Sequence, residues 1–150
     1  MKPGKIRVIA ICPFYHQGKI LVLEGFDSHK QTKYCRPLGG GVDVGETSET
    51  ALRREISEEL GLEITGPELL TVIENLFTLE GTPGHEIVFV YQARFVDESA
   101  YRRESFTVRE INAEPYEARW RTLDSFDDDD RLVPAELIPV LAKLAEKEAS

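Results

Sequence analysis

The chain has 150 residues and a mass of 17.0 kDa, which predicts a single domain over residues 1–150. Its 27 acidic and 18 basic residues give a formal net charge of −9, which argues against an extended surface for nucleic acid or anionic membrane. No apolar run approaches the roughly 20 residues that a membrane span needs. Cys12 and Cys35 are too few for a disulfide framework and predict two reduced thiols in a cytoplasmic protein.

The first predicted elements are two strands over residues 6–14 and 19–24, which are rich in branched apolar side chains. A turn at residues 16–18 predicts that these two strands pair. Residues 25–33 are polar and predict a loop. Further strands are predicted over residues 34–38, 86–96, 105–111 and 118–123, with one or two more over residues 63–79, and helices over residues 47–60 and 134–148. Because strands and helices do not alternate regularly, the fold class is predicted as α/β of the α+β type, a sandwich with helices flanking a mixed central sheet.

The helix over residues 47–60 has clear boundaries, since Thr47 or Ser48 can cap its start and Gly61 follows its end. Leucine and isoleucine side chains at helical spacing form an apolar stripe for packing on the sheet, at Leu52, Ile56 and Leu60. The terminal helix carries a similar stripe at Leu137, Ile138, Leu141, Leu144 and Ala145.

Three carboxylates lie beside the first apolar stripe. On a helical wheel, Glu55, Glu58 and Glu59 share an arc of about 100°. Alone, such a group is most simply a solvated acidic face, but a glycine-rich loop leads into this helix, and Arg54 can pair with Glu46 or Glu55. Clustered carboxylates repel unless a cation lies among them, and their oxygen atoms suit Mg²⁺ or Mn²⁺ better than zinc.

The spacing of this segment is specific. It has Gly40, then Glu46, then Arg54-Glu55-Ile56, Glu58-Glu59 and Gly61-Leu62, separated by five, seven, one and one residues. This pattern resembles the complete Nudix box of the Nudix hydrolases, over residues 40–62. The resemblance implies a metal-dependent pyrophosphohydrolase that cleaves a diphosphate linkage in a nucleoside diphosphate derivative by attack of water on phosphorus.

The resemblance also implies roles for individual residues. Glu58 and Glu59 would be metal ligands, and Glu55 would be a further ligand or the base that activates water. The other expected roles are an orienting ion pair between Arg54 and Glu46, and a backbone carbonyl ligand from Gly40. The predicted catalytic set is therefore Glu46, Arg54, Glu55 and Glu58.

One departure precedes the box. Many family members have Pro-Gly-Gly there, whereas this chain has Leu38 between the proline and the glycines. Backbone N–H groups of Gly39 and Gly41 are candidate phosphate donors in this loop. Arg36, at the start of the loop, is predicted to bind phosphate through its guanidinium fork, with a plain surface arginine as the alternative.

A further acidic metal ligand often follows the box in this family. Glu117 is the predicted residue because it precedes a C-terminal strand, and surface charge is the simpler alternative. Other acids that compete for this role are Glu104, Glu110 and Glu114. The acidic run at residues 127–130 lacks the spacing of a calcium loop and predicts a solvated loop.

The sequence leaves the substrate open beyond a small nucleoside diphosphate-linked molecule. Two other functions also stay open: a nucleotide-sensing module that keeps the fold without cleaving, and a pyrophosphohydrolase acting on RNA 5′ ends. The net charge of −9 argues against the RNA alternative. Small enzymes of this kind often associate with two-fold symmetry, so a homodimer is an alternative to a monomer.

Overall fold

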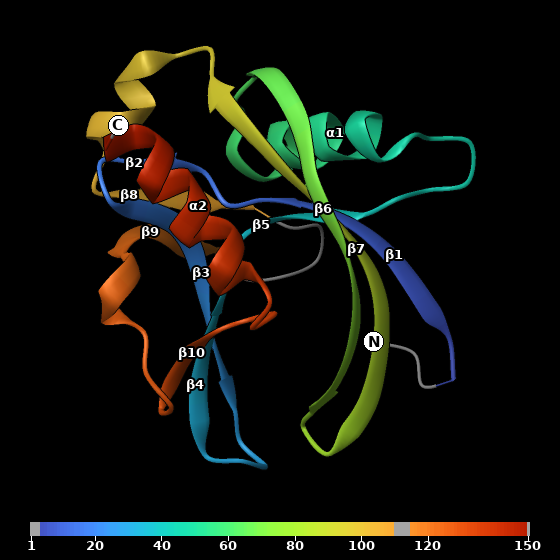
Figure 1. Ribbon diagram of the computed structural model, residues 1–150. Helices are drawn as coiled ribbons and strands as arrows, with labels where there is room; N and C mark the ends of the chain where they lie inside the picture. Colours follow the sequence, from blue (N-terminus) through green and yellow to red (C-terminus); the bar gives the residue numbers. More distant parts are fainter. Residues whose placement is uncertain (1–3, 110–114, 150) are drawn as a thin grey trace.

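The computed structural model describes residues 4–109 and 115–149, which form two mixed sheets with a helix on either side (Figure 1). In spatial order, the first sheet contains β5 (Leu38–Gly41), β1 (Ile6–Cys12), β7 (Thr82–Phe95) and β6 (Ile64–Leu79). The second contains β10 (Asp130–Leu132), β4 (Thr32–Arg36), β3 (Lys19–Asp27), β9 (Tyr116–Thr122) and β8 (Ser105–Val108), with β2 (Tyr15–His16) paired to β3. The helices are α1 (Ser48–Leu60) and α2 (Leu137–Ala149), with short 3₁₀ helices η1 (Glu98–Arg102) and η2 (Leu123–Ser125).

The predicted mixed α/β class is confirmed, but the expected central sheet is divided in two. β1 pairs in parallel with β7, and β10 with β4, while the other neighbours are antiparallel. The predicted pairing of residues 6–14 with residues 19–24 is wrong. β1 ends at Cys12, before Pro13, whose nitrogen cannot donate to a ladder, and the turn joins only the short β2 to β3.

Strand alternation separates the interior into two cores on opposite faces of the sheets. Alternate residues of β1 and β3 enter different cores, because successive side chains of a strand point to opposite faces. Leu52 and Ile56 of α1 pack in the first core, and Leu137 and Leu141 of α2 pack in the second. Figure 1 shows α2 in front of the second sheet and α1 behind β6. The two helices therefore cover opposite faces.

The boundaries predicted for α1 are confirmed. The Thr47 side chain caps the helix by accepting a hydrogen bond of 3.2 Å from the backbone N–H of Thr50. Gly61 adopts the left-handed conformation at φ 67°, and its N–H donates to the Ser57 carbonyl at 2.9 Å. These two capping interactions fix where the acidic helix begins and where it ends.

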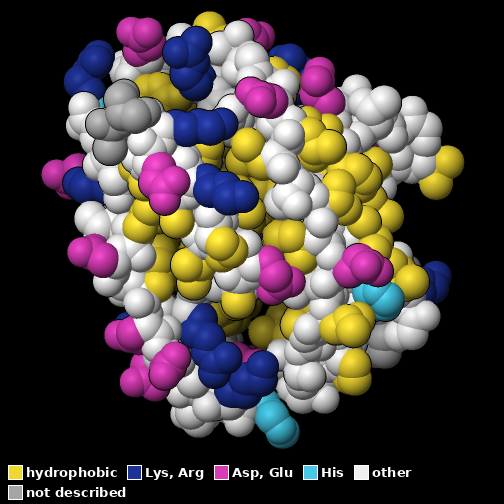
Figure 2. All heavy atoms as spheres, in the orientation of Figure 1, with side chains coloured by type: hydrophobic (Ala, Val, Ile, Leu, Met, Phe, Trp, Pro, Cys, Tyr) yellow, Lys and Arg dark blue, Asp and Glu magenta, His cyan; other side chains and the backbone are white. Residues whose placement is uncertain are grey.

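The C-terminal part of the chain differs more from expectation. α2 begins at Leu137, three residues after the predicted start, and Ile138 is 55% exposed although it was expected in the apolar stripe. In the acidic run, Asp130 is not part of a solvated loop, because it starts β10 and lies 3.0 Å from Arg121. No helix in the described residues is long and apolar enough to cross a membrane. On the face shown in Figure 2, cationic and anionic side chains are interspersed.

Candidate functional site

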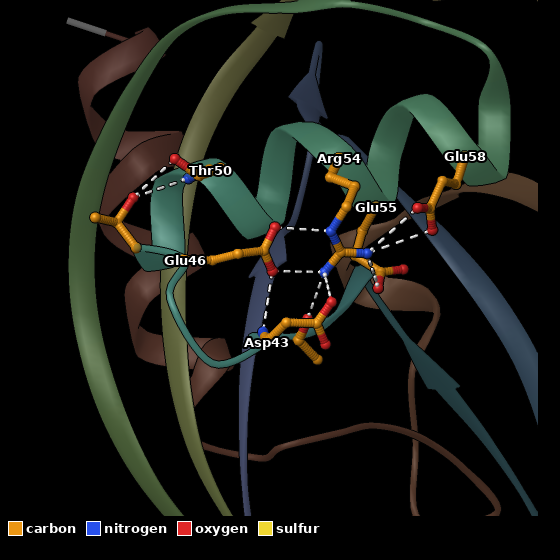
Figure 3. A network of polar contacts seen from close by, with 8 residues as sticks. Asp43, Glu46, Thr50, Arg54, Glu55 and Glu58 are labelled. Atoms are coloured by element: carbon orange, nitrogen blue, oxygen red, sulfur yellow. Dashed lines mark hydrogen bonds and ion pairs between the residues drawn. The ribbon is translucent and has the colours of Figure 1, made fainter.

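Arg54 is the centre of a polar network between α1 and the loop that precedes it (Figure 3). Its Nε and Nη2 each donate to one carboxylate oxygen of Glu46 at 2.8 Å, as a two-pronged pair. Nη2 also donates to the Gly41 carbonyl at 2.9 Å, and Nη1 donates to Glu55 at 3.0 Å. Both carboxylate oxygens of Glu58 lie 3.4 Å from Nη1. One guanidinium therefore joins the loop to two acids of the helix.

Glu46 is held in its charged form. The hydrogen bonds from Arg54 lower its pKa from the ordinary 4.5 to about 2, helped by the backbone N–H of Asp43 at 3.0 Å. The same pairing, chiefly with Glu46, raises the pKa of Arg54. Both groups are therefore ionised at neutral pH. The Arg54–Glu46 pair is a fixed element of the network.

Glu55 occupies a different environment. Its side chain is 19% exposed, and burial raises the pKa of its carboxyl against the opposing effect of Arg54, with the charge of Glu58 acting in the same direction as burial. The carboxylate lies directly against Gly40 of β5. A Cβ atom at Gly40 would be 2.5 Å from Oε2 and 2.7 Å from Oε1 of Glu55, so a side chain at this position would displace the acid from where it lies.

The other two acids of the predicted arc differ in exposure. The Glu58 side chain is 56% exposed, whereas Glu59 is only 4% exposed and lies on the buried face of α1. The Glu59 carbonyl accepts a hydrogen bond of 3.2 Å from the Arg109 N–H, which follows β8. The arc predicted from the helical wheel thus runs from solvent at Glu58, through half-buried Glu55, to the interior at Glu59.

In β5, which precedes α1, the glycines and Leu38 have separate structural roles. Gly39 has φ of 140°, and a Cβ atom there would overlap the Ala10 carbonyl, so this glycine is required for pairing β5 with β1. The Gly41 carbonyl is held by Arg54. Leu38, the residue that departs from the family pattern, is fully buried in the first core. The exposed Arg36 lies on β4 in the other sheet, where it pairs with Leu23 of β3, and its side chain forms no hydrogen bond or ion pair with another described residue.

Of the acids predicted outside the box, neither Glu117 nor Glu104 forms an ion pair with Arg54. The Glu117 carboxylate accepts a hydrogen bond of 2.8 Å from exposed Arg119 on the same strand. Because Ala118 faces the core that contains α1, alternation directs Glu117 and Arg119 to the opposite face. Glu104 is exposed beside η1. The alternatives Glu110 and Glu114 lie outside the described residues.

Comparison with known proteins decides the family. The NUDIX domain model matches residues 4–141. The chain belongs to the Nudix family. Among solved structures, it is similar to a MutT Nudix hydrolase from Burkholderia pseudomallei, with 27% identity, a TM-score of 0.60, and coverage of 83% of this chain and 88% of that one. The predicted class, a Nudix-type pyrophosphohydrolase, is confirmed.

Two further structures share the fold at lower identity. An ADP-ribose pyrophosphatase from Streptococcus suis is 14% identical with a TM-score of 0.54, and the match covers 93% of this Nudix chain and 91% of that protein. An ADP compounds hydrolase is 16% identical with a TM-score of 0.62, and the match covers 100% of this chain and 77% of that one. These two comparisons support the Nudix fold and leave the substrate open.

Nudix hydrolases typically use divalent metal ions, and the chemistry of this site fits such an ion. The carboxylates of Glu55 and Glu58 and a backbone carbonyl are hard oxygen donors, which suit Mg²⁺ or Mn²⁺. Because Gly40 has no side chain, the Glu55 carboxylate can lie directly against the β5 backbone. Within residues 4–109 and 115–149, no three His, Cys, Asp or Glu side chains form a cluster able to hold a metal.

Two residues at the site were not among those predicted from the sequence, Asp43 within the Nudix box and Arg7 outside it. Asp43 lies 3.5 Å from Arg54, and its N–H donates to Glu46. An acid three residues before Glu46 in a short loop was the available sequence signal. Arg7 of β1 lies near Gly41, since its Nη2 would be 3.6 Å from a Cβ there, and it pairs with Glu86 of β7 at 3.4 Å. Only the parallel register of β1 and β7 brings those two side chains together.

Proposed function

We propose that this Nudix chain hydrolyses a diphosphate linkage in a small nucleoside diphosphate derivative, with Mg²⁺ or Mn²⁺. The oxygen of water bonds to one phosphorus, and the bridging P–O bond breaks. The bridging oxygen leaves with its electron pair on the other phosphate, and the proton of water passes to a base. One observation supports this proposal most directly. The Glu55 carboxylate lies against the backbone of Gly40, and the guanidinium of Arg54 donates to both Glu55 and Glu58.

The proposed roles follow from the environments of the acids. Glu55, whose pKa is raised by burial, is suited to accept a proton from water, or serves as a ligand. Glu58, Glu59 and the Gly40 carbonyl are the other proposed metal ligands. A divalent ion, when bound, neutralises phosphate charge and lowers the pKa of a coordinated water. The Arg54–Glu46 pair orients Glu55 and the Gly41 carbonyl.

The substrate class rests on the family and on charge. Nudix enzymes act on nucleoside diphosphate-linked substrates. We further propose that residues 1–150 act as one domain in the cytoplasm, where the two buried cysteines, which are free in the structure, would stay reduced. A homodimer remains an alternative, and a light-scattering mass near 17.0 kDa would exclude it. The net charge of −9 and the mixed charges in Figure 2 disfavour RNA as the substrate.

A hydrolysis screen tests this proposal. Nucleoside diphosphate derivatives and an RNA with a 5′ triphosphate are incubated with Mg²⁺, Mn²⁺ or EDTA, and the products are identified by mass in ¹⁸O-labelled water to locate the attacked phosphorus. We expect metal-dependent cleavage of at least one compound. Its absence across the panel, together with tight binding of one member, would support the sensing alternative. Cleavage of triphosphate RNA ends alone would support the RNA alternative.

A matched pair of variants tests the site. Glu58→Gln should lower turnover by at least about 100-fold, because it removes a charged oxygen donor from the proposed site, while folding is retained. Glu49→Gln is the control, since Glu49 is an exposed acid of the same helix, paired only with Arg53 among the described residues. Near-normal turnover in Glu58→Gln, or equal losses in both variants, would contradict the assignment.

A further inference from the structure

A hollow of about 320 Å³ lies beside η1, at the turn between β2 and β3 and the end of β9. Its size is at the lower end of the range for small-molecule pockets. Its lining includes three aromatic rings and three permanent cations, from His16, Tyr101, Trp120, Lys19, Arg102 and Arg103. None of these residues belongs to the Nudix box or to the Arg54 network.

The aromatic wall is held in place by its own contacts. The rings of His16 and Tyr101 have centroids 4.6 Å apart, and those of Tyr101 and Trp120 are 5.9 Å apart. The Tyr101 hydroxyl accepts a hydrogen bond of 2.9 Å from the Phe95 N–H, which fixes that ring to β7. Rings positioned in this way offer a flat apolar ligand a preformed surface for stacking.

The cations around this wall are available for a ligand. Arg103 lies over the Phe106 ring at 4.4 Å, and neither arginine nor Lys19 forms an ion pair with another described residue. Glu104 is the one acid in the lining. Asp97, which caps η1, accepts hydrogen bonds from the N–H and hydroxyl of Ser99, which lower its pKa, and the charges of Arg103 and Arg102 add to that effect. In a chain of net charge −9, the lining of the hollow itself has a local excess of positive charge, with three cations and one acid.

The hollow is separate from the proposed catalytic site. It is lined by Glu104, whereas Arg109, at the other end of β8, bonds to the Glu59 carbonyl. Five residues of extended chain span about 16 Å between these points. A molecule of mononucleotide size in the hollow would therefore leave the Arg54 network uncovered.

We infer that this hollow is a second binding site, for an aromatic anion of nucleoside monophosphate size. The base stacks on the wall of His16, Tyr101 and Trp120, and the phosphate is held by the guanidinium groups of Arg102 and Arg103, whose forks match phosphate oxygens. The site requires neither metal nor hydrolysis.

Trp120 is the one tryptophan of the chain, so its fluorescence reports directly on this site. AMP is titrated in EDTA, with adenosine and inorganic phosphate as partial probes, and calorimetry repeats the titration. We expect a saturable change with AMP and weaker binding of both partial probes. The absence of binding by both methods would overturn the inference.

Variants separate this site from the catalytic one. Arg102→Gln with Arg103→Gln should weaken AMP binding at least about tenfold, because two charge-assisted contacts are lost. Arg119→Gln, an exposed arginine outside the hollow, should bind AMP as the wild type does. Unchanged AMP affinity in the double variant would refute the site. Because these titrations contain no metal, their result is independent of whether the hydrolysis screen succeeds.

Discussion

Two half-buried arginines organise two different parts of this Nudix protein. The side chain of Arg54 is 28% exposed and that of Arg121 is 18% exposed, and each lies within 3.5 Å of more than one carboxylate. The partners of Arg54 lie between Gly41 and Glu58, in one continuous segment. Those of Arg121 include Ser125 and Asp130 nearby in the chain, and also Glu24 and Cys35, which are more than 80 residues away.

The two networks also differ in what surrounds the acids that each arginine binds. Arg54 holds acids against a glycine cradle and leaves Glu58 in solvent, an arrangement suited to binding a cation. Arg121 ties together β3, β4, β9 and β10, and its guanidinium lies 4.7 Å from the Phe126 ring. Burial, helped by the charge of Asp130, raises the pKa of the Cys35 thiol to about 12, so this cysteine stays protonated and unreactive. We therefore propose that the Arg54 network serves the proposed hydrolysis, whereas the Arg121 network stabilises the second sheet.

Arginine-to-lysine substitutions should separate the two networks most strongly. Arg54→Lys should lower kcat about 100-fold on the substrate that the screen identifies. A single ammonium group cannot form the two-pronged pair with Glu46 and also donate hydrogen bonds to the Gly41 carbonyl and to Glu55. Arg121→Lys should leave kcat within about twofold, since that network lies outside the proposed reaction. Steady-state kinetics with Mg²⁺ measures both. Comparable losses of kcat would erase the distinction.

Substitutions at two adjacent glycines test whether the space at Gly40 is needed to position Glu55. Gly39→Ala should lower the free energy of unfolding by about 2 kcal/mol, because a Cβ would strike the β1 backbone at a left-handed φ. Gly40→Ala should instead displace only the flexible Glu55 carboxylate, so hydrolysis falls about tenfold while stability changes little. Urea unfolding and kinetics are measured for both variants. A fully active Gly40→Ala enzyme would count against the role of Glu55.

Removing the second arginine should affect stability alone. Arg121→Met should lower the free energy of unfolding by about 2 kcal/mol, because Asp130 and the buried Cys35 lose their partner. Arg119→Met, two residues away, removes only an exposed pair with Glu117 and should cost about 0.5 kcal/mol. Urea denaturation with unchanged m-values provides the comparison. Equal losses would show that the Arg121 network adds nothing beyond a surface pair.

The smallest expected effect concerns pH. Glu46 has a pKa of about 2 in the folded chain, below the ordinary 4.5, so its stabilising contribution is complete above pH 4.5 and is lost as pH falls toward 2. Glu55 acts oppositely, because its raised pKa makes the charged form unfavourable, and acid relieves that cost. Glu46→Gln should therefore lose less stability than the wild type between pH 4.5 and 2. Parallel unfolding profiles in that range would contradict this.

The box region was largely predictable because its interactions are local. Thr47 and Gly61 set the ends of α1 through hydrogen bonds within four residues, as the sequence indicates. Glu46 and Glu55 were the alternative partners expected for Arg54. Arg54 donates hydrogen bonds to both, because a guanidinium has enough N–H groups for two carboxylates. The wheel also predicted the shared arc of the three acids. It could not predict how deeply Glu59 is buried, since that depends on β8 packing against α1.

The strand arrangement was less predictable. Residues 6–14 and 19–24 are both apolar strands joined by a turn, a pattern typical of a hairpin, yet β1 pairs with β5 and β7 in the other sheet. Parallel pairing of β1 with β7 joins segments about 80 residues apart and has no local signal. The face on which Glu117 lies, opposite Ala118, was likewise decided only by how β9 packs on the first core.

The sequence alone determined the family, the acidic helix and its caps, and the acids beside Arg54, because each depends on spacings of a few residues. Tertiary structure decided which of those acids is exposed, half-buried or buried, and it assembled the Arg121 network and the hollow beside η1. Those features join residues separated by dozens of positions. Their formation depends on sheet register and on the burial of apolar side chains across the whole fold, which no short spacing encodes.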